Sequence, residues 1–280
     1  MVANALFVGI GQSNEAGVCV AADVNNFSGF ATPQPAIRYF RYLGKSGNPP
    51  SSVVRDPVSG VGDLQPRVIG AGSPFNPGTN GPEISMLKTI HADSRFANRV
   101  CGLSFALDAS DTGRWIPSAT FPTGSVAYPG TPANWFSTLV TNIKEAQTLT
   151  NSSIRLGGLF VENGTSDALS GGLAAAYYPN MDAIVNGLWN AFSCHFPVVI
   201  GRISQDFINN FAGAATDGPT VRAAQVQWAG DNGMPWIDND ALVTMSASPY
   251  DPHYNSNSQA TLGVNRAVAW LSRKQQRRRR

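Results

Sequence analysis

Short hydrophobic runs alternate along this chain with longer stretches in which apolar and polar residues recur at a helical period. The runs are rich in Val, Ile, Leu and Phe, which is typical of strands buried on both faces. They predict strands at 5–10, 100–107, 154–161, 198–203 and 235–237. The stretches between them predict helices at 82–91, 135–149, 173–192, 220–229 and 259–273.

This alternation predicts an α/β fold, because helices of this length between strands imply right-handed crossovers that cover both faces of a parallel sheet. We therefore expect a three-layer αβα sandwich around a five-stranded, mainly parallel sheet. The 280 residues fit one domain, 1–272, with no internal repeat and no linker. Long loops rich in Gly, Pro, Ser and Asn are predicted at about 44–80 and 108–134.

Composition changes this picture mainly at the C-terminal end. Hydrophobic residues make up 42% of the chain, enough for a sizeable core, and only 14% of residues are charged. The formal net charge is +2, but six of the 20 basic residues lie within 273–280, and the rest of the chain is net acidic. We expect 273–280 to be a disordered basic tail. Binding of nucleic acid or an anionic surface by this tail is the alternative, and we do not expect nucleic acid to be the primary partner.

The cysteines and the N-terminus narrow the classes of protein to which this chain can belong. Cys19, Cys101 and Cys194 are widely scattered and lack the spacing of a zinc site or a disulfide framework, although one pair stays possible. The first apolar run is too short to span a bilayer, and no signal peptide is visible. We expect a soluble chain, cytoplasmic or virion-associated, that needs neither a metal nor an organic cofactor nor a membrane. Its oligomeric state stays open.

Candidate chemistry gathers where the predicted strands end, and ligands of open parallel sheets bind at that edge. Ser13 follows the first strand, and its hydroxyl needs a nearby base to become a nucleophile. We expect His91, at the end of a helix, and His195, before a strand, to be structural. His253 lies in a polar loop two residues after Asp251, and an aspartate there can orient the imidazole.

The third predicted strand runs into the sequence ENGTSDA. The side-chain amide of Asn163 can donate a hydrogen bond to a developing oxyanion there. Alternatively the segment is a turn in which Ser166 or Asp167 caps the next helix. The two readings are compatible, since Asp167 can cap while Asn163 donates.

Four blocks, GQSNEAG, GPEIS, GTSDA and DPH before a helix, occur in this order along the chain. They resemble the blocks GQSN, GPE, QGESD and DxxH of the SGNH hydrolase superfamily, in its sialate O-acetylesterase-like and acetylxylan esterase (carbohydrate esterase family 6-like) branch. DTGRW, VRAAQ and WIDNDAL are looser matches, so the resemblance runs through nearly the whole chain. It implies a flavodoxin-like sheet and a serine esterase that releases small acyl groups, above all acetyl, from a carbohydrate.

Carried over to this chain, the resemblance implies Ser13 as the nucleophile, His253 as the general base and Asp251 as the acid that orients it. The family's acid usually precedes the histidine by three positions, where this chain has Tyr250. Asp251 is one residue nearer, and a dyad of Ser13 and His253 is the alternative.

The resemblance also implies an oxyanion hole and its supports. The donors would be the backbone N–H groups of Ser13 and Gly81 and the side chain of Asn163, where the family commonly has glutamine. The supporting residues would be Gln12 and Asn14, bracing the serine turn, and Glu83, holding the Gly81 loop.

Two substitutions within the blocks keep other functions open. Thr165 replaces the glutamate of QGESD, and Glu15 replaces an apolar residue after GQSN. A catalytically weak or inactive carbohydrate-binding or virion module on the same fold is one alternative, and a short-chain lipase or thioesterase of the same superfamily is another. Four loop aromatics are candidates either for stacking on sugars or for packing in the core: Phe75, Trp115, Tyr128 and Trp135.

Overall fold

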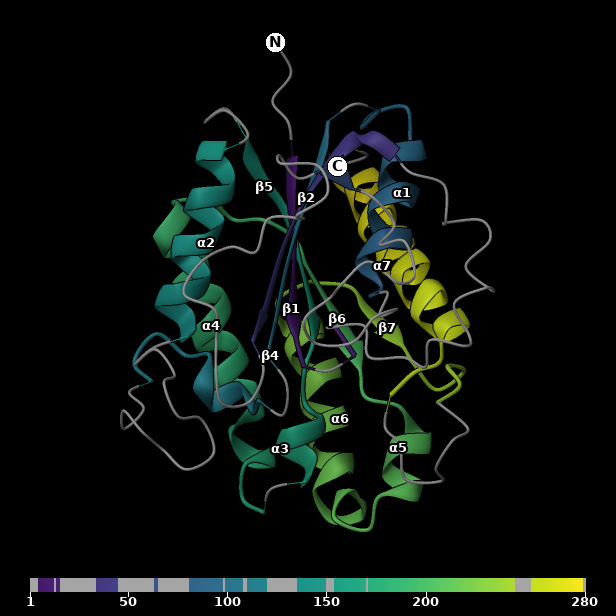
Figure 1. Cartoon of the computed structure of the whole chain (residues 1–280). Helices are drawn as coiled ribbons and strands as arrows, with labels where there is room; N and C mark the ends of the chain where they lie inside the picture. Colours follow the sequence, from purple (N-terminus) through teal and green to yellow (C-terminus); the bar gives the residue numbers. More distant parts are fainter. Residues whose placement is uncertain are drawn as a thin grey trace.

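Figure 1 shows the computed structural model of the whole chain. The residues that the structure describes are 5–12, 14–15, 34–44, 63–64, 81–97, 99–107, 110–119, 135–149, 154–169, 171–244 and 253–278. Ser13, Asp251, Cys19, Phe75 and Tyr128, and most of the predicted loops 44–80 and 108–134, lie outside these residues.

Within the described residues, one sheet of seven strands forms the middle layer. The strands are β1 (Ala5–Gly11), β2 (Gln34–Gly44), β3 (Asp63–Leu64), β4 (Val100–Leu107), β5 (Arg155–Glu162), β6 (Val198–Arg202) and β7 (Trp236–Asp238). Their order is β3-β2-β4-β1-β5-β6-β7, and every neighbouring pair is parallel except β2 and β3.

All five predicted strands are present, and the predicted fold class is confirmed. Among themselves they follow the order second, first, third, fourth, fifth, which is that of flavodoxin-like sheets. The sequence pattern missed β2 and β3. Arg38 and Arg41 interrupt the apolar run of β2, and β3 is only two residues long, too short to show a period.

The helices are α1 (Glu83–Ala92), α2 (Trp135–Leu149), α3 (Thr165–Leu169), α4 (Tyr177–Phe192), α5 (Gln205–Asn210), α6 (Ala214–Asp231) and α7 (Ser256–Arg278). The five predicted helices are all found, and the short α3 and α5 were not predicted. The expected disordered tail is wrong for 273–278, because α7 continues to Arg278. This segment contains neither Gly nor Pro and consists largely of good helix formers, so nothing in it ends the helix.

The core lies on both faces of the sheet. Figure 1 shows α2 and α4 on one face and α1 and α7 on the other. Along β1, Leu6 and Val8 join the cluster that includes α2, α4 and α6, whereas Phe7 joins the cluster that includes α1 and α7. Trp270 of α7 meets Phe7 edge-on, with ring centroids 4.8 Å apart. Burial on both faces is why the strands read as continuous apolar runs.

Two aromatic residues considered for sugar stacking belong to this core. Trp115 and Trp135 are almost completely buried and pack edge-to-face, with centroids 6.0 Å apart. A sugar-stacking role for these two is therefore wrong. Cys101 is buried, and Cys194 is a free thiol. No helix among the described residues is long and apolar enough to cross a membrane.

Candidate functional site

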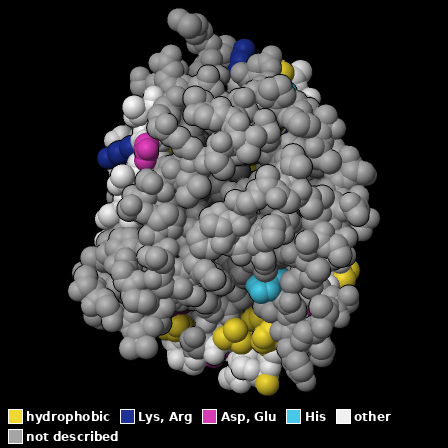
Figure 2. Space-filling model, in the orientation of Figure 1, with side chains coloured by type: hydrophobic (Ala, Val, Ile, Leu, Met, Phe, Trp, Pro, Cys, Tyr) yellow, Lys and Arg dark blue, Asp and Glu magenta, His cyan; other side chains and the backbone are white. Residues whose placement is uncertain are grey.

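The carboxyl ends of β1 and β5 lie side by side, at the switch point where flavodoxin-like sheets bind ligands. The helices that follow β5 and β6, α3 and α5, lie at the bottom of Figure 1, so the carboxyl edge faces downward there. In the same orientation, Figure 2 shows a histidine side chain at the surface in the lower half of the view, with hydrophobic side chains gathered below it.

Gln12 bridges the end of β1 to the start of α3. Its side-chain Oε1 accepts hydrogen bonds from the hydroxyl and the backbone N–H of Thr165, the latter at 3.1 Å, and its Nε2 donates to the hydroxyl of Ser166. Its backbone N–H donates to the carbonyl of Glu162 at 3.2 Å. The GQSN and GTSDA blocks are therefore in direct contact, and Thr165 takes part in that contact.

Asn14 joins the same turn to the segment before α7. Its Oδ1 accepts a hydrogen bond from the backbone N–H of Tyr254 at 3.0 Å and one from Nε2 of Gln259 at 3.4 Å. Tyr254 follows His253 directly in the chain. The structure thus brings together the covalent neighbours of Ser13 and His253, which are 240 residues apart in the sequence.

The segment that carries His253 is held by its own contacts. Its imidazole is partly buried. Tyr254 forms a bridge with Thr244, and the backbone N–H of Asn255 donates to the carbonyl of Val243 at 3.0 Å. The side chain of Asn255 accepts a hydrogen bond from the N–H of Ser258 at 2.9 Å, which caps α7.

The buried side chain of Asn163 has a defined orientation. Its Oδ1 accepts a hydrogen bond from the N–H of Gly164 at 2.9 Å, and Gly164 has a φ of +128°, which favours glycine. This leaves Nδ2 as the donor end of the amide. The backbone carbonyl of Asn163 accepts from Gln225 at 2.9 Å and from the Tyr177 hydroxyl at 3.3 Å. Gln225, in the VRAAQ block, thus supports a residue predicted for the oxyanion hole.

Gly81 is buried immediately before α1 and leaves no room for a side chain, because a Cβ there would lie 1.9 Å from Oε2 of Glu83. The Glu83 carboxylate therefore folds back over Gly81. The hydroxyl of Ser85 donates to the carbonyl of Ala260 in α7 at 2.8 Å. The start of α1 is thus joined to the first turns of α7.

Behind these segments lies a buried charge network that sequence analysis did not predict. Arg266 of α7 is fully buried and forms ion pairs with Glu15, from Nη1 to Oε2 at 2.6 Å, and with Glu162, from Nη2 to Oε2 at 3.2 Å. Asn239 donates to the other oxygen of Glu162 at 3.0 Å. A lone arginine inside the apolar stretch VNRAVAWL was the available signal, since such a residue is buried only with partners.

The network contains more carboxylates than arginines. Burial raises the pKa of Glu15 to about 8; the attraction of Arg266 opposes this, and the charges of Glu83 and Glu162 add to it. Burial likewise raises the pKa of Glu162. Two buried acids thus share one guanidinium, and burial shifts the pKa of both upward.

Asp167 of the GTSDA block is fully buried inside α3 rather than at the position before it. Its carboxylate accepts hydrogen bonds from the backbone N–H of Thr112 at 3.1 Å and from its hydroxyl at 2.5 Å. Burial raises the pKa of Asp167 to about 6, although the bonds from Thr112 oppose the shift. The main described partner of this acid is therefore the DTGRW block.

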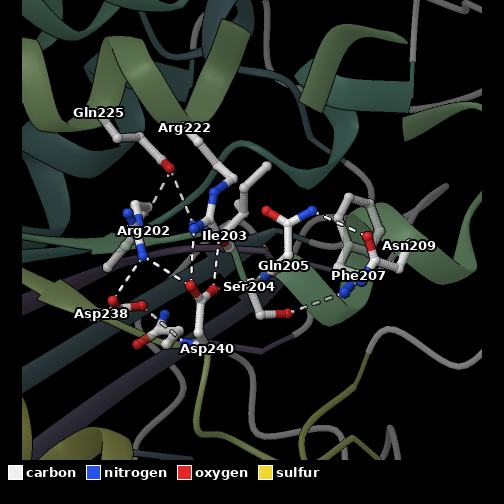
Figure 3. A network of polar contacts seen from close by, with 12 residues as sticks. Arg202, Ile203, Ser204, Gln205, Phe207, Asn209, Arg222, Gln225, Asp238 and Asp240 are labelled. Atoms are coloured by element: carbon white, nitrogen blue, oxygen red, sulfur yellow. Dashed lines mark hydrogen bonds and ion pairs between the residues drawn. The ribbon is translucent and has the colours of Figure 1, made fainter. Parts of the chain in front are cut away.

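A second charge network lies at the carboxyl ends of β6 and β7 (Figure 3). Asp240 accepts hydrogen bonds from Arg222 at 2.6 and 2.9 Å and from Arg202 at 2.9 Å. These contacts, the bond from Arg222 first, lower the pKa of Asp240 to about 2. The guanidinium of Arg202 also pairs with Asp238 and lies 4.8 Å from the ring centroid of Trp236.

The two remaining histidines lie elsewhere. His91 is in the last turn of α1, and His195 lies before β6, at the amino end of the strand, with its ring 4.5 Å from that of Trp189. Among the described residues, no group of three or more His, Cys, Asp or Glu side chains can hold a metal ion.

Comparison with known proteins gives structural matches only. No family model matches the chain, and no curated protein matches it. A solved protein from Arabidopsis thaliana has a TM-score of 0.66 at 18% identity, covering 97% of this chain and 99% of its own. NanS has a TM-score of 0.62 at 14% identity, covering 99% of both chains.

A carbohydrate acetylesterase from Xanthomonas citri matches with a TM-score of 0.64 at 14% identity, over 95% of this chain and 55% of its own. The fold is that of the SGNH hydrolases. The resemblance predicted from the sequence blocks is therefore confirmed at the level of the fold. At these identities the likeness concerns the fold and not the substrates.

Proposed function

We propose that this protein is a serine esterase that hydrolyses small acyl esters, with acetyl esters of carbohydrates as its substrate class. The observation that carries the proposal is the hydrogen bond from the backbone N–H of Tyr254 to Oδ1 of Asn14 at 3.0 Å. It joins the neighbour of the proposed nucleophile Ser13 to the neighbour of the proposed base His253. The similarity in fold to a carbohydrate acetylesterase supports the substrate class.

In the proposed reaction the hydroxyl oxygen of Ser13 attacks the ester carbonyl carbon while His253 accepts its proton. The tetrahedral oxyanion accepts hydrogen bonds from Nδ2 of Asn163 and from the backbone N–H groups of Ser13 and Gly81. His253 then protonates the leaving alcohol, and water hydrolyses the acyl-enzyme by the same route. Asp251 would orient the imidazole and stabilise its cationic form.

The orientation of Asn163 suits this role. Its Oδ1 is occupied by the N–H of Gly164, so its Nδ2 is the group available to a substrate oxygen. Asparagine is shorter than the glutamine common in the family, but the buried contacts of its backbone carbonyl hold it at the strand end. Loss of one oxyanion donor typically costs about 10²–10³ in kcat.

The test is hydrolysis of p-nitrophenyl acetate by the purified protein and its Ser13→Ala variant. We expect turnover by the wild type and a loss of at least about 10³-fold in Ser13→Ala, because removal of the nucleophile leaves only binding and oxyanion stabilisation. Ser137→Ala, at an exposed serine of α2, is the matched control and should keep full activity.

Turnover that survives unchanged in Ser13→Ala would refute the mechanism. A wild-type protein that neither hydrolyses the ester nor reacts with a serine-directed phosphonate would instead support an inactive binding module. A series of p-nitrophenyl esters of increasing chain length separates an acetylesterase, with activity falling beyond acetyl, from a short-chain lipase or thioesterase.

A further inference from the structure

We propose that Arg266 is a positioning residue of this site, holding from behind the two strand ends that carry Ser13 and Asn163. This inference rests on the proposed function. Arg266 touches no substrate in this proposal and acts only through Glu15 and Glu162.

One guanidinium spans the two segments. Glu15 lies two residues after Ser13, and Glu162 lies immediately before Asn163. Arg266 pairs with the first carboxylate at 2.6 Å and with the second at 3.2 Å. Because a guanidinium is planar and its donors point in set directions, two such bonds constrain the separation of the groups that they join.

The helix that bears Arg266 supplies a third connection. Gln259, two turns earlier in α7, donates to Asn14 at 3.4 Å, and α7 itself begins three residues after His253. The segments proposed to carry the nucleophile, the base and an oxyanion donor therefore share one helix as their support. A shift of α7 would move all three together.

The surroundings of the network leave it little freedom to rearrange. Glu15 and Arg266 have no exposed surface, and Glu162 is only 6% exposed. A Cβ at Gly9 would lie 1.9 Å from Oε1 of Glu15, and one at Gly201 would lie 1.9 Å from Oε2 of Glu162. Glycines on β1 and β6 thus provide the space that these two carboxylates fill.

Stability alone is a poor explanation for such a network. Desolvation of buried ion pairs often cancels their attraction, and hydrophobic residues of similar volume frequently stabilise a fold equally well. Here the paired carboxylates stand within two residues of Ser13 and next to Asn163. A role in fixing the geometry of these residues explains that location, whereas a role in stability alone would not require it.

The test compares kcat and KM for p-nitrophenyl acetate in the wild type, Ser13→Ala, Arg266→Met, Arg266→Lys and Arg95→Met. Arg95 forms a partly buried ion pair with Asp93 after α1, away from the proposed site, and serves as the matched control. All are assayed at a low temperature at which circular dichroism shows each variant folded, with rates expressed per folded molecule.

We expect Arg266→Met to lower kcat by about 10²-fold with KM within about twofold of wild type, since small misplacements of reacting groups cost that much in rate. Arg266→Lys should recover part of the loss in kcat, because its ammonium group keeps the positive charge but lacks the two separate Nη donors of the guanidinium. Arg95→Met should behave as wild type. A purely structural role would lower the folded fraction but leave kcat per folded molecule unchanged.

The outcomes separate the two proposals. An inactive wild type, or an active Ser13→Ala, refutes the proposed function and the positioning role with it. An active wild type and inactive Ser13→Ala, together with an unchanged kcat in Arg266→Met, overturn the positioning role alone. If Arg266→Met does not fold, Arg266→Lys and Glu15→Gln decide: lowered kcat at unchanged KM supports the role, and unchanged kcat in both overturns it.

Discussion

Among the described residues, two networks of arginine and carboxylate lie at the same edge of the sheet, and their environments differ. Arg266 meets Glu15 and Glu162 where almost no surface is exposed. Arg222 meets Asp240 where the aspartate side chain keeps 36% of its surface exposed. The bonds between Arg266 and Glu15 and between Arg222 and Asp240 are equally short, at 2.6 Å.

The pKa values of the carboxyl groups shift in opposite directions in the two networks. The pKa of Glu15 rises to about 8 because burial outweighs its arginine, whereas the pKa of Asp240 falls to about 2 because hydrogen bonding to Arg222 outweighs its smaller burial. Distance alone therefore does not determine what an ion pair contributes. The desolvation of its members decides whether the charged form is favoured.

Removal of the arginine should give the largest difference in the free energy of unfolding between the two networks. We expect Arg266→Met to lower the free energy of unfolding by about 3–5 kcal/mol, because it leaves buried carboxylates without their partner. Arg222→Met should cost roughly 1 kcal/mol, the upper range of exposed pairs. Urea denaturation at pH 7 measures both. Equal losses in the two variants would show that burial does not distinguish the networks.

The pH dependence of stability sharpens the comparison. The folded protein binds the proton of Glu15 more tightly than the unfolded chain does, so this group's contribution to stability is full below about pH 4.5 and is lost as pH rises through about 8. The charged groups that act on it are Arg266, Glu83 and Glu162. Glu15→Gln should therefore gain stability relative to wild type between pH 5 and 8, by up to about 1.4 kcal/mol per pH unit.

Urea midpoints at pH 5, 6.5 and 8 measure this difference, and Ser137→Ala provides the reference profile. If the stability of Glu15→Gln and that of the wild type change in parallel with pH, the carboxyl group of Glu15 does not change its protonation over this range. The claim that the pKa values of the two networks shift in opposite directions would then be wrong.

We expect the smallest change in the free energy of unfolding at Asp240. Asp240→Asn should lower the free energy of unfolding by less than about 1 kcal/mol at pH 7, as for other exposed pairs. Because the pKa of this group is lowered in the folded state, its contribution is present above about pH 4 and is lost as pH falls through about 2. Asp238→Asn, at a side chain that is 51% exposed, is the control and should change little. A loss in Asp240→Asn as large as that in Arg266→Met would contradict the comparison.

Much of the fold was predictable because its signals are local. The five predicted strands lie where their apolar runs are, since burial on both faces requires such runs. The sequence pattern does not reveal β2, because arginines interrupt its apolar residues and its parallel neighbour β4 is distant in the sequence. The sequence does not fix the end of α7, because a cluster of positive charges is typical of a disordered tail, although the residues of 273–278 favour a helix.

The candidate site likewise has features that the sequence predicts and features that it does not. The blocks around Gln12, Gly81 and Asn163 could be recognised from their order along the chain. Their mutual contacts, such as the bond from Tyr254 to Asn14, could not be read from spacing. Glu15 appeared only as a departure from a family pattern, and Arg266 as a lone charge in an apolar helix.

By itself, the sequence determined the alternation of strands and helices and the polar residues that follow each strand, because hydrophobic period and residue type act over a few neighbouring positions. Only the tertiary structure decided which of those strand ends meet, and it placed one arginine between two glutamates that lie 251 and 104 residues away. Such contacts depend on strand order and on the packing of α7 against the sheet. Both emerge only when the whole chain buries its core.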